Sequence, residues 1–173
     1  LIDAVPYAMP LVDSLGFKPD FSAIPGAVLK KSKLMFLNYP NNPTAAVAKE
    51  DFLKEAVGFC KENSLILVYD NAYSEFTYGD YRAPSIFQAE GGRDIAIELN
   101  SCSKMFNMTG YRVGFAAGNP ELMAGLKKLK PQIDSGCPMF IQRAAVKGLD
   151  AYTSKKRPKE VEDNLRIYQT RRD

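Results

Sequence analysis

The sequence predicts an α/β fold in which helices flank a mostly parallel sheet. Short apolar runs, typical of buried strands, recur along the chain, and a segment with helical periodicity separates the first two of them. Polar and turn-forming residues follow these runs, as expected where strands end at the edge of a sheet. A strand, a helix and a second strand in this order are typical of a crossover between parallel strands.

The strands and the first helix follow from the pattern of apolar residues. Residues 33–38 form the first apolar run, and a stretch rich in asparagine and proline closes it. Apolar side chains recur at helical spacing over residues 49–63, which predicts an amphipathic helix. Residues 65–69 and 95–99 are predicted to form the second and third buried strands, and residues 112–117 the fourth.

Prolines, capping residues and apolar spacing predict the structure of the N-terminal segment and of the C-terminal part of the chain. Two prolines within residues 5–11 exclude a helix interior and favour an extended segment at the edge of the sheet. An asparagine, a proline and a glutamate at 119–121 predict the start of a helix that runs to about residue 130. Residues 140–149 are expected to form another helix, and the tail from residue 158 a mostly exposed one.

Composition limits the classes of function. The chain has 173 residues, 46% of them hydrophobic and 25% charged, which suits one domain with an ordinary core. The formal net charge is +3, and so small an excess of basic residues usually lies on a solvated helix face. It does not favour nucleic-acid binding. No apolar run is long enough to span a bilayer, and no signal peptide is recognisable. A cytoplasmic protein without a membrane partner is therefore expected.

Cysteine and histidine usage restricts the chemistry further. The chain has three cysteines without a Cys-x-x-Cys spacing, which argues against a disulfide framework and a structural zinc site. It has no histidine, which removes Ser-His and Cys-His pairs and histidine-bearing metal sites. No metal is expected, and acid–base chemistry must fall to Lys, Asp, Glu, Tyr or Cys.

Residues 101–112 place a lysine, two serines and an arginine between two predicted strands. Ligands bind beyond the carboxyl ends of strands in open parallel sheets. Ser101 and Arg112 suit a phosphate group, since they offer a hydroxyl and a bidentate guanidinium. Lys104 is either a solvated surface charge or, beside the apolar strand, an amine suited to a Schiff base. The Ser-x-x-Lys spacing also occurs in penicillin-binding proteins, but their companion motifs are absent.

The ends of the other two strands carry polar groups that could act together with Lys104. Asp70 ends a buried strand, where a carboxylate needs a cation or a proton donor. A protonated pyridine nitrogen would serve, and capping of a turn is the alternative. Tyr73 could donate a hydrogen bond to a ring phenolate, and Ala72 is small enough to lie against a ring. Asn42 follows the first strand.

Three stretches together resemble the class I/II aminotransferases, which are pyridoxal-phosphate enzymes of fold type I. They are residues 38–44 (Asn-Tyr-Pro-Asn-Asn-Pro-Thr), 69–75 (Tyr-Asp-Asn-Ala-Tyr-Ser-Glu) and 101–114, and they match three family motifs in order and spacing. The resemblance covers nearly the whole chain and is nearest to the LL-diaminopimelate aminotransferase branch and its alanine- and aspartate-using relatives. Ala45 departs from the pattern, because most members have glycine there; this change is expected only to stiffen a loop.

The resemblance implies pyridoxal 5'-phosphate as cofactor and amino acids and 2-oxo acids as substrates. Lys104 would be the Schiff-base lysine that moves the proton, Asp70 would pair with the pyridine nitrogen, and Tyr73 would bond the ring oxygen with Asn42. Ser101 and Arg112 would hold the phosphate. The cofactor-binding set implied by the family is Asn42, Asp70, Ala72, Tyr73, Ser101, Ser103, Lys104 and Arg112, with Lys104, Asp70 and Tyr73 as the catalytic residues.

The resemblance also implies how much of an enzyme the chain contains. Family members are much longer, and neither their N-terminal glycine-rich loop and ring-stacking aromatic nor their C-terminal substrate-binding arginine is found. Residues 1–157 would form the central part of the large, cofactor-binding domain, and 158–173 the start of a connecting helix toward an absent small domain. A homodimer is implied for the full-length form. A pyridoxal-phosphate lyase and a non-catalytic cofactor-sensing domain remain as alternatives.

Overall fold

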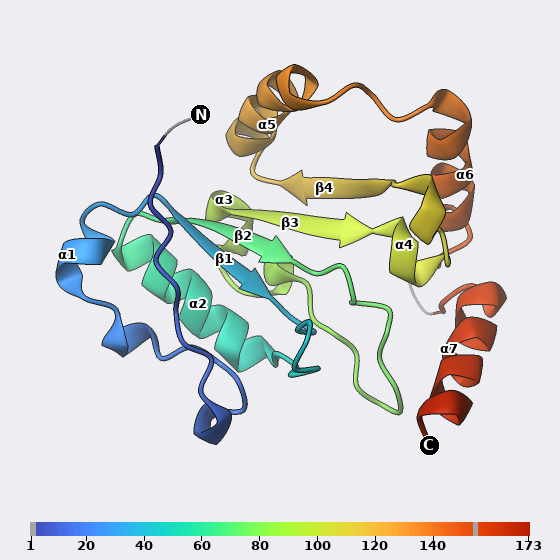
Figure 1. Ribbon diagram of the computed structural model, residues 1–173, viewed down its shortest axis with the longest axis horizontal. Coiled ribbons are helices and arrows are strands. Elements are labelled where there is room, and N and C mark those ends of the chain that lie inside the picture. Colours follow the sequence, from blue (N-terminus) through green and yellow to red (C-terminus); the bar gives the residue numbers. More distant parts are fainter. Residues whose placement is uncertain (1–2, 154–155) are drawn as a thin grey trace.

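The computed structural model describes residues 3–153 and 156–173 and contains a four-stranded sheet in the order β1-β2-β3-β4 (Figure 1). Strands β1, β2 and β3 are parallel, and β4 runs antiparallel to β3. The mostly parallel sheet predicted from the sequence is confirmed. The strands are β1 (Leu34–Asn38), β2 (Ile66–Asp70), β3 (Ala96–Ser101) and β4 (Gly114–Gly118).

Helices connect and flank these strands (Figure 1). The α-helices are α1 (Gly26–Leu29), α2 (Glu50–Glu62), α3 (Gly92–Ile95), α4 (Cys102–Met105), α5 (Pro120–Ile133), α6 (Met139–Leu149) and α7 (Lys159–Arg172). Short 3-10 helices are η1 (Asp13–Leu15), η2 (Phe21–Ala23), η3 (Ile86–Gln88) and η4 (Thr109–Tyr111). The long helices α2, α5, α6 and α7 lie close to the ranges that the sequence predicts.

Helix α2 connects β1 to β2 and buries the apolar face that its spacing predicts. Acidic side chains in its first turn and Lys61 in its last turn complement the helix dipole. Its buried face joins the main core cluster with Leu37 of β1 and Tyr69 of β2. The Phe21 ring stacks on the rings of Phe52 and Phe59, with centroids 5.6 and 5.1 Å apart. Fully burying each such side chain stabilises the fold by roughly 1.5–3 kcal/mol.

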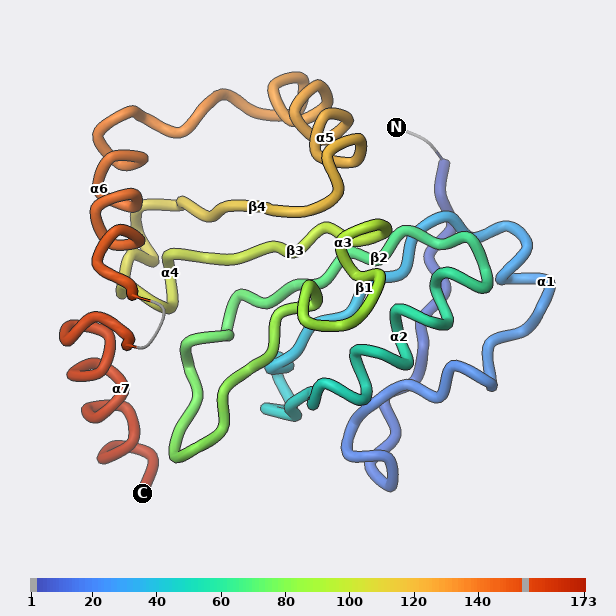
Figure 2. The backbone as a smooth tube through the Cα atoms, turned by 180° about the vertical axis from the view of Figure 1, so that it is seen from behind, coloured from blue at the N-terminus to red at the C-terminus, as the bar shows by residue number. Residues whose placement is uncertain are grey.

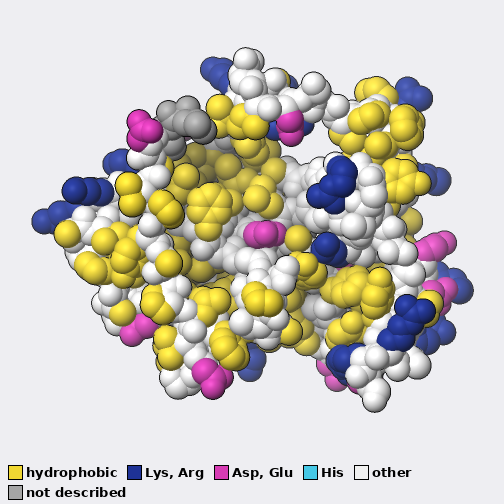
Figure 3. Space-filling model, viewed as in Figure 1, with side chains coloured by type: hydrophobic (Ala, Val, Ile, Leu, Met, Phe, Trp, Pro, Cys, Tyr) yellow, Lys and Arg dark blue, Asp and Glu magenta, His cyan; other side chains and the backbone are white. Residues whose placement is uncertain are grey.

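Strand β1 is buried on one face only, which corrects the prediction of a fully buried strand. Met35 and Leu37 are 4% and 5% exposed, whereas Leu34 and Phe36 are 45% and 63% exposed. Figure 2 shows α2 and α3 on the same side of the sheet. Figure 3 shows hydrophobic side chains on the opposite side of the molecule, between the N-terminal segment and α5. An unbroken apolar run does not reveal which of its residues a helix covers.

The N-terminal segment is not a strand, contrary to the edge segment predicted for residues 5–11. Described residues before Val12 form no regular element, and Val12 makes one isolated antiparallel bridge to Lys18. Pro6 and Pro10 have no N–H group to donate to a sheet. Val5 is 91% exposed, whereas Met9 is partly buried against the core, so the segment packs on the core without joining the sheet.

The C-terminal helices agree with the predictions. Asn119 caps α5 as expected, because its Oδ1 accepts from the N–H groups of Glu121 and Leu122. Helix α7 is mostly exposed, as predicted, and its buried residues are Val161 and Leu165, two of the apolar residues at the helical spacing that predicts it. Within residues 3–153 and 156–173, no helix has the length and apolar character needed to cross a membrane.

Candidate active site

The candidate site lies where the three parallel strands end, at one edge of the sheet (Figure 1). The register pairs Asn38 of β1 with Asp70 of β2, and Asp70 with Leu99 of β3. The Asn38 side-chain amide donates to the Asp70 carbonyl oxygen at 3.0 Å, and the Asn71 N–H donates to the Leu99 carbonyl at 2.9 Å. The polar residues at these strand ends are therefore held side by side by backbone contacts.

Asp70 is half-buried and faces a turn at the end of β2. Its Oδ1 accepts a hydrogen bond from the Ala72 N–H at 3.1 Å, so the turn-capping role left open by the sequence is present. No ion pair of Asp70 is found among residues 3–153 and 156–173. A carboxylate that is partly removed from water and forms no ion pair is suited to bind a proton-bearing nitrogen.

Tyr73 connects the β1 loop, the β2 loop and the lysine. The Asn42 amide Nδ2 donates to the Tyr73 hydroxyl oxygen at 3.3 Å. The Lys104 Nζ lies 5.4 Å from the centroid of the Tyr73 ring, within the range of a cation–π contact. Three sequence-predicted residues, from two loops and helix α4, are thus adjacent.

Ser101, Ser103 and Arg112 gather around the start of the short helix α4. Ser101 is the N-cap, and its Oγ accepts from the Ser103 N–H at 3.2 Å. The Arg112 guanidinium donates to the Ser103 Oγ at 3.4 Å and to the Thr109 carbonyl at 2.9 Å. Two hydroxyls and a guanidinium at one place can bind the oxygens of a phosphate.

Strand β4 is predicted to begin at Arg112, but it begins at Gly114. The backbone conformation around Arg112 explains the difference. Arg112 has φ of 51°, in the left-handed region, and ends η4 instead of extending the strand. A Cβ at Gly114 would lie 2.6 Å from the Asn100 carbonyl oxygen of β3, so only glycine fits there. The close approach of β4 at Gly114 brings the Arg112 loop against the end of β3.

The contacts leave two groups within the predicted site. Ala72 is half-buried and contributes its N–H to Asp70. Among the hydrogen bonds and ring contacts of the described residues, none joins Asp70 directly to Lys104 or Ser101. The Asn42–Tyr73–Lys104 group and the Ser101–Ser103–Arg112 group are related through α4, which contains Lys104 and is capped by Ser101.

The sequence predictions miss four polar residues that lie in the strands or directly after them. They are Asn38, Asn71, Glu98 and Asn100, and all four make side-chain hydrogen bonds at or below the strand ends. Glu98 gave one signal, because it is a charged residue inside an apolar run. The asparagines lie beside predicted site residues, but nothing in their spacing indicates which groups they contact.

Cys60 and Cys102 are buried and are not activated nucleophiles. Burial raises the pKa of the Cys60 thiol to about 12 and also raises the pKa of Cys102. Both thiols therefore stay neutral near pH 7 and are poor nucleophiles. No group of three or more metal-binding side chains is found in the described part of the chain. Among the predicted site residues, Lys104 carries the primary amine.

Comparison with known proteins identifies the family. The sequence model described as "Aminotransferase class I and II" matches residues 1–173. The chain belongs to the class I and II aminotransferases. This aminotransferase chain is 44% identical over 173 residues to an LL-diaminopimelate aminotransferase of Natranaerobius thermophilus, covering 100% of this chain and 44% of that protein. The resemblance identified from three motifs is confirmed.

Solved structures confirm the aminotransferase fold. Apo-BacF of Bacillus subtilis matches with a TM-score of 0.86 and 41% identity, over 95% of this chain and 42% of that one. A probable N-succinyldiaminopimelate aminotransferase of Thermus thermophilus matches with a TM-score of 0.84 and 36% identity, over 95% of this chain and 43% of that one. This aminotransferase chain spans less than half the length of these relatives.

Proposed function

We propose that this chain carries the cofactor-binding centre of a pyridoxal-phosphate-dependent aminotransferase, which moves an amino group from an amino acid to a 2-oxo acid. One observation carries the proposal: the Lys104 amine lies 5.4 Å from the Tyr73 ring, on a helix that Ser101 caps. An amine, a phenol and a phosphate-type site are thereby held close together on the ends of neighbouring elements. Family membership supports the same conclusion.

The donors and acceptors of the site fit pyridoxal phosphate. The Arg112 guanidinium and the Ser101 and Ser103 hydroxyls match a phosphate dianion in charge and hydrogen-bonding capacity. Asp70 offers a carboxylate without a cationic partner among the described residues, which suits a protonated ring nitrogen. Tyr73 and Asn42 would bind the ring oxygen, and Ala72 would pack against the ring.

The roles of the residues follow from these fits. Pyridoxal phosphate, when bound, supplies a ring that withdraws electrons from the α carbon of the amino acid. The Lys104 amine would hold the cofactor and then move the proton at that α carbon as general base and acid. Asp70 would keep the ring nitrogen protonated, and Arg112 would fix the phosphate so that the reacting atoms stay aligned.

The wider function extends beyond the residues present. Residues 1–157 would belong to the large domain, and residues 158–173 would begin a connecting helix toward a small domain. A relative named LL-diaminopimelate aminotransferase makes LL-diaminopimelate a candidate amino donor. The family resemblance adds alanine and aspartate as candidates. A cytoplasmic homodimer would complete the site. Because a partial site binds substrate poorly, the 173-residue chain should turn over slowly by itself.

A titration with pyridoxal phosphate tests the proposal. The wild-type chain is expected to give a saturable visible absorbance change that Lys104→Arg abolishes and the exposed-site control Lys128→Arg retains. Equal signals from wild type and Lys104→Arg would contradict the proposal. Amino acids added one at a time should convert the bound cofactor to its aminated form. Release of ammonia or pyruvate without a second oxo acid would instead indicate a lyase.

A further inference from the structure

A buried carboxylate beneath the proposed site has no role in the chemistry described so far. Glu98 lies within β3 and is 6% exposed. No cation pairs with it among residues 3–153 and 156–173. A buried carboxylate without a cation is strongly disfavoured unless hydrogen bonds compensate, so an apolar side chain would serve packing better. Its presence next to the core residue Tyr69 therefore points to another role.

Hydrogen-bond donors surround both oxygens of Glu98. Oε2 accepts from the Ser85 hydroxyl at 2.7 Å and from the Ile86 N–H at 2.8 Å, at the start of η3. Oε1 accepts from the side-chain amides of Asn71 at 3.2 Å and Asn100 at 3.1 Å. One oxygen is thus anchored in η3, while the other joins residues from the ends of β2 and β3.

The two asparagines are the chain neighbours of proposed site residues. Asn71 directly follows Asp70, and Asn100 directly precedes Ser101. The bonds to Oε1 therefore fix the spacing between a carboxylate proposed for the ring nitrogen and a hydroxyl proposed for the phosphate. A shift of either strand end would break a charge-assisted hydrogen bond inside the protein.

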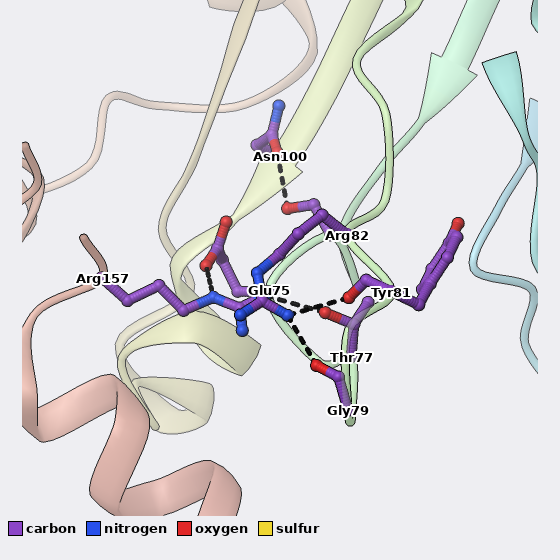
Figure 4. A network of polar contacts seen from close by, with 8 residues as sticks. Glu75, Thr77, Gly79, Tyr81, Arg82, Asn100 and Arg157 are labelled. Carbon is purple, nitrogen blue, oxygen red and sulfur yellow. Dashed lines mark hydrogen bonds and ion pairs between the residues drawn. The ribbon is translucent and has the colours of Figure 1, made fainter. Parts of the chain in front are cut away.

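Asn100 extends the connection to the loop after β2. Its Oδ1 accepts a hydrogen bond from the Ser74 hydroxyl at 3.4 Å, and Ser74 follows Tyr73. Figure 4 shows Asn100 bonded toward this loop, which continues through Glu75 and Thr77. Glu98 thus bonds directly to Asn71 and Asn100, the chain neighbours of Asp70 and Ser101. Through Asn100 it is also linked to Ser74, the chain neighbour of Tyr73.

We propose that Glu98 is a positioning residue for the cofactor site, which sets the spacing of Asp70, Tyr73 and Ser101 through Asn71 and Asn100. The inference rests on the proposed function, since these three residues matter together only if they bind one ligand. It predicts coupling across strands: a change at the end of β2 should be felt at the end of β3, and the reverse.

Hydrogen exchange of the chain without cofactor tests this coupling. The Ala72 N–H bonds to Asp70, and the Ser103 N–H bonds to Ser101, so their exchange rates report on the two strand ends. In Glu98→Gln, one carboxylate oxygen becomes an N–H₂ group that faces other donors, so hydrogen bonds are lost. The exchange rates of the Ala72 and Ser103 N–H groups should therefore rise about tenfold or more. The helical Leu53 N–H reports on global stability and should change much less.

Variants of the neighbours separate positioning from simple loss of packing. Asn71→Ser should speed exchange of Ser103, and Asn100→Ser should speed exchange of Ala72, each across the strand boundary. Ser85→Ala removes one bond from the same carboxylate on the η3 side and should change neither rate. The proposal would be overturned if Glu98→Gln sped the exchange of the Ala72, Ser103 and Leu53 N–H groups equally. It would also be overturned if each asparagine variant changed exchange only at its own strand end. The asparagine variants decide the matter if Glu98→Gln fails to fold.

Cofactor binding distinguishes this inference from the proposed function. Glu98→Gln should bind pyridoxal phosphate about tenfold more weakly than Ser85→Ala. Equal binding by the two variants would overturn the positioning role and leave the proposed function intact. A wild-type chain that binds no pyridoxal phosphate would overturn the proposed function, and the exchange rates would then decide the cross-strand coupling without it.

Discussion

Ala45 shows how one residue can depart from the family pattern at a measurable cost. Its φ of 59° lies in the left-handed region, which costs a residue with a Cβ roughly 1–2 kcal/mol relative to glycine. Ala45→Gly should therefore stabilise the chain by about 0.5–1 kcal/mol in urea unfolding, after the entropy that glycine adds to the unfolded state. The change was expected from the sequence only to stiffen a loop.

The neighbouring Ala46 provides a control for Ala45. It is half-buried against the core and does not have a positive φ. Ala46→Gly should destabilise the chain by roughly 0.5–1 kcal/mol, through the same gain of unfolded-state entropy without relief of strain. If both glycine variants lowered stability equally, the left-handed conformation of Ala45 would be wrong.

Residues of the site could be predicted where their chemistry is distinctive. Lys104 and Arg112 stand out because a lysine, serines and an arginine share one short stretch, and Asp70 because it ends an apolar run. The sequence could not place Glu98 and its asparagines, because a carboxylate in a strand does not reveal which donors surround it. The bond between Asn71 and Glu98 spans 27 residues, beyond the reach of local patterns.

At the scale of the element, β1 offers a direct test of the one-sided packing of the sheet. Leu37→Ala empties a site that is 5% exposed and should cost about 2–5 kcal/mol. Phe36→Ala, one position away on the opposite face, should cost less than about 1 kcal/mol because its ring is 63% exposed. Urea unfolding of the two variants measures the difference, and similar losses would contradict the uncovered face.

Helix α7 and Arg157, which precedes it in the chain, contact the loop after β2 through aromatic and polar groups. The Arg157 Nε donates to the Glu75 carboxylate at 2.6 Å, and its Nη2 donates to the Thr77 hydroxyl at 2.8 Å (Figure 4). The Phe76 and Tyr168 rings lie 4.7 Å apart. These partners are remote in sequence, which explains why helical spacing predicted α7 but not the loop that it contacts.

Removing Arg157 should loosen α7. The two side chains of the ion pair are 11% and 23% exposed, so Arg157→Ala leaves the Glu75 carboxylate partly buried without its cation and should cost about 2–3 kcal/mol. Adding Glu75→Ala to this variant should cost less than Glu75→Ala does alone. Urea midpoints and protease cleavage of α7 measure this, with Lys159→Ala in an exposed pair as an unchanged control. Strict additivity would show that the pair does not hold the helix.

At the scale of the whole molecule, buried phenols make stability fall at high pH. Burial raises the pKa of Tyr39 to about 12, and burial followed by the nearby Tyr81 and Glu98 raises the pKa of Tyr69. An acid whose pKa is raised by folding stabilises the fold fully below its unfolded pKa of about 10. That contribution is lost as the pH rises through the folded pKa.

The urea midpoint should therefore fall between about pH 10 and pH 12. Tyr39→Phe removes one buried phenol and should make this fall shallower, although it also loses the hydrogen bond to the Phe17 carbonyl. Tyr111→Phe, at a tyrosine that is 51% exposed, should leave the pH dependence as in wild type. An identical slope in all three proteins would rule out the buried phenols as its cause.

The order of strands and helices was more predictable than which face of the sheet they cover. Apolar runs and helical spacing determined the order of strands and long helices, because these patterns are local. They did not predict which sheet face lacks a covering helix or that the N-terminal segment stays unpaired. Both depend on what surrounds the sheet, and this chain covers 44% of the length of an LL-diaminopimelate aminotransferase.

The central claim is that Lys104 holds the cofactor. The most direct measurement is to incubate the chain with pyridoxal phosphate, reduce it with borohydride and map the modified lysine by peptide mass spectrometry. In the wild-type chain we expect one pyridoxyl group, on Lys104. In Arg112→Ala at low cofactor concentration we expect none on the peptide that contains Lys104, because the phosphate is no longer held. Modification spread over surface lysines, with Lys104 no more reactive than the others, would contradict the claim.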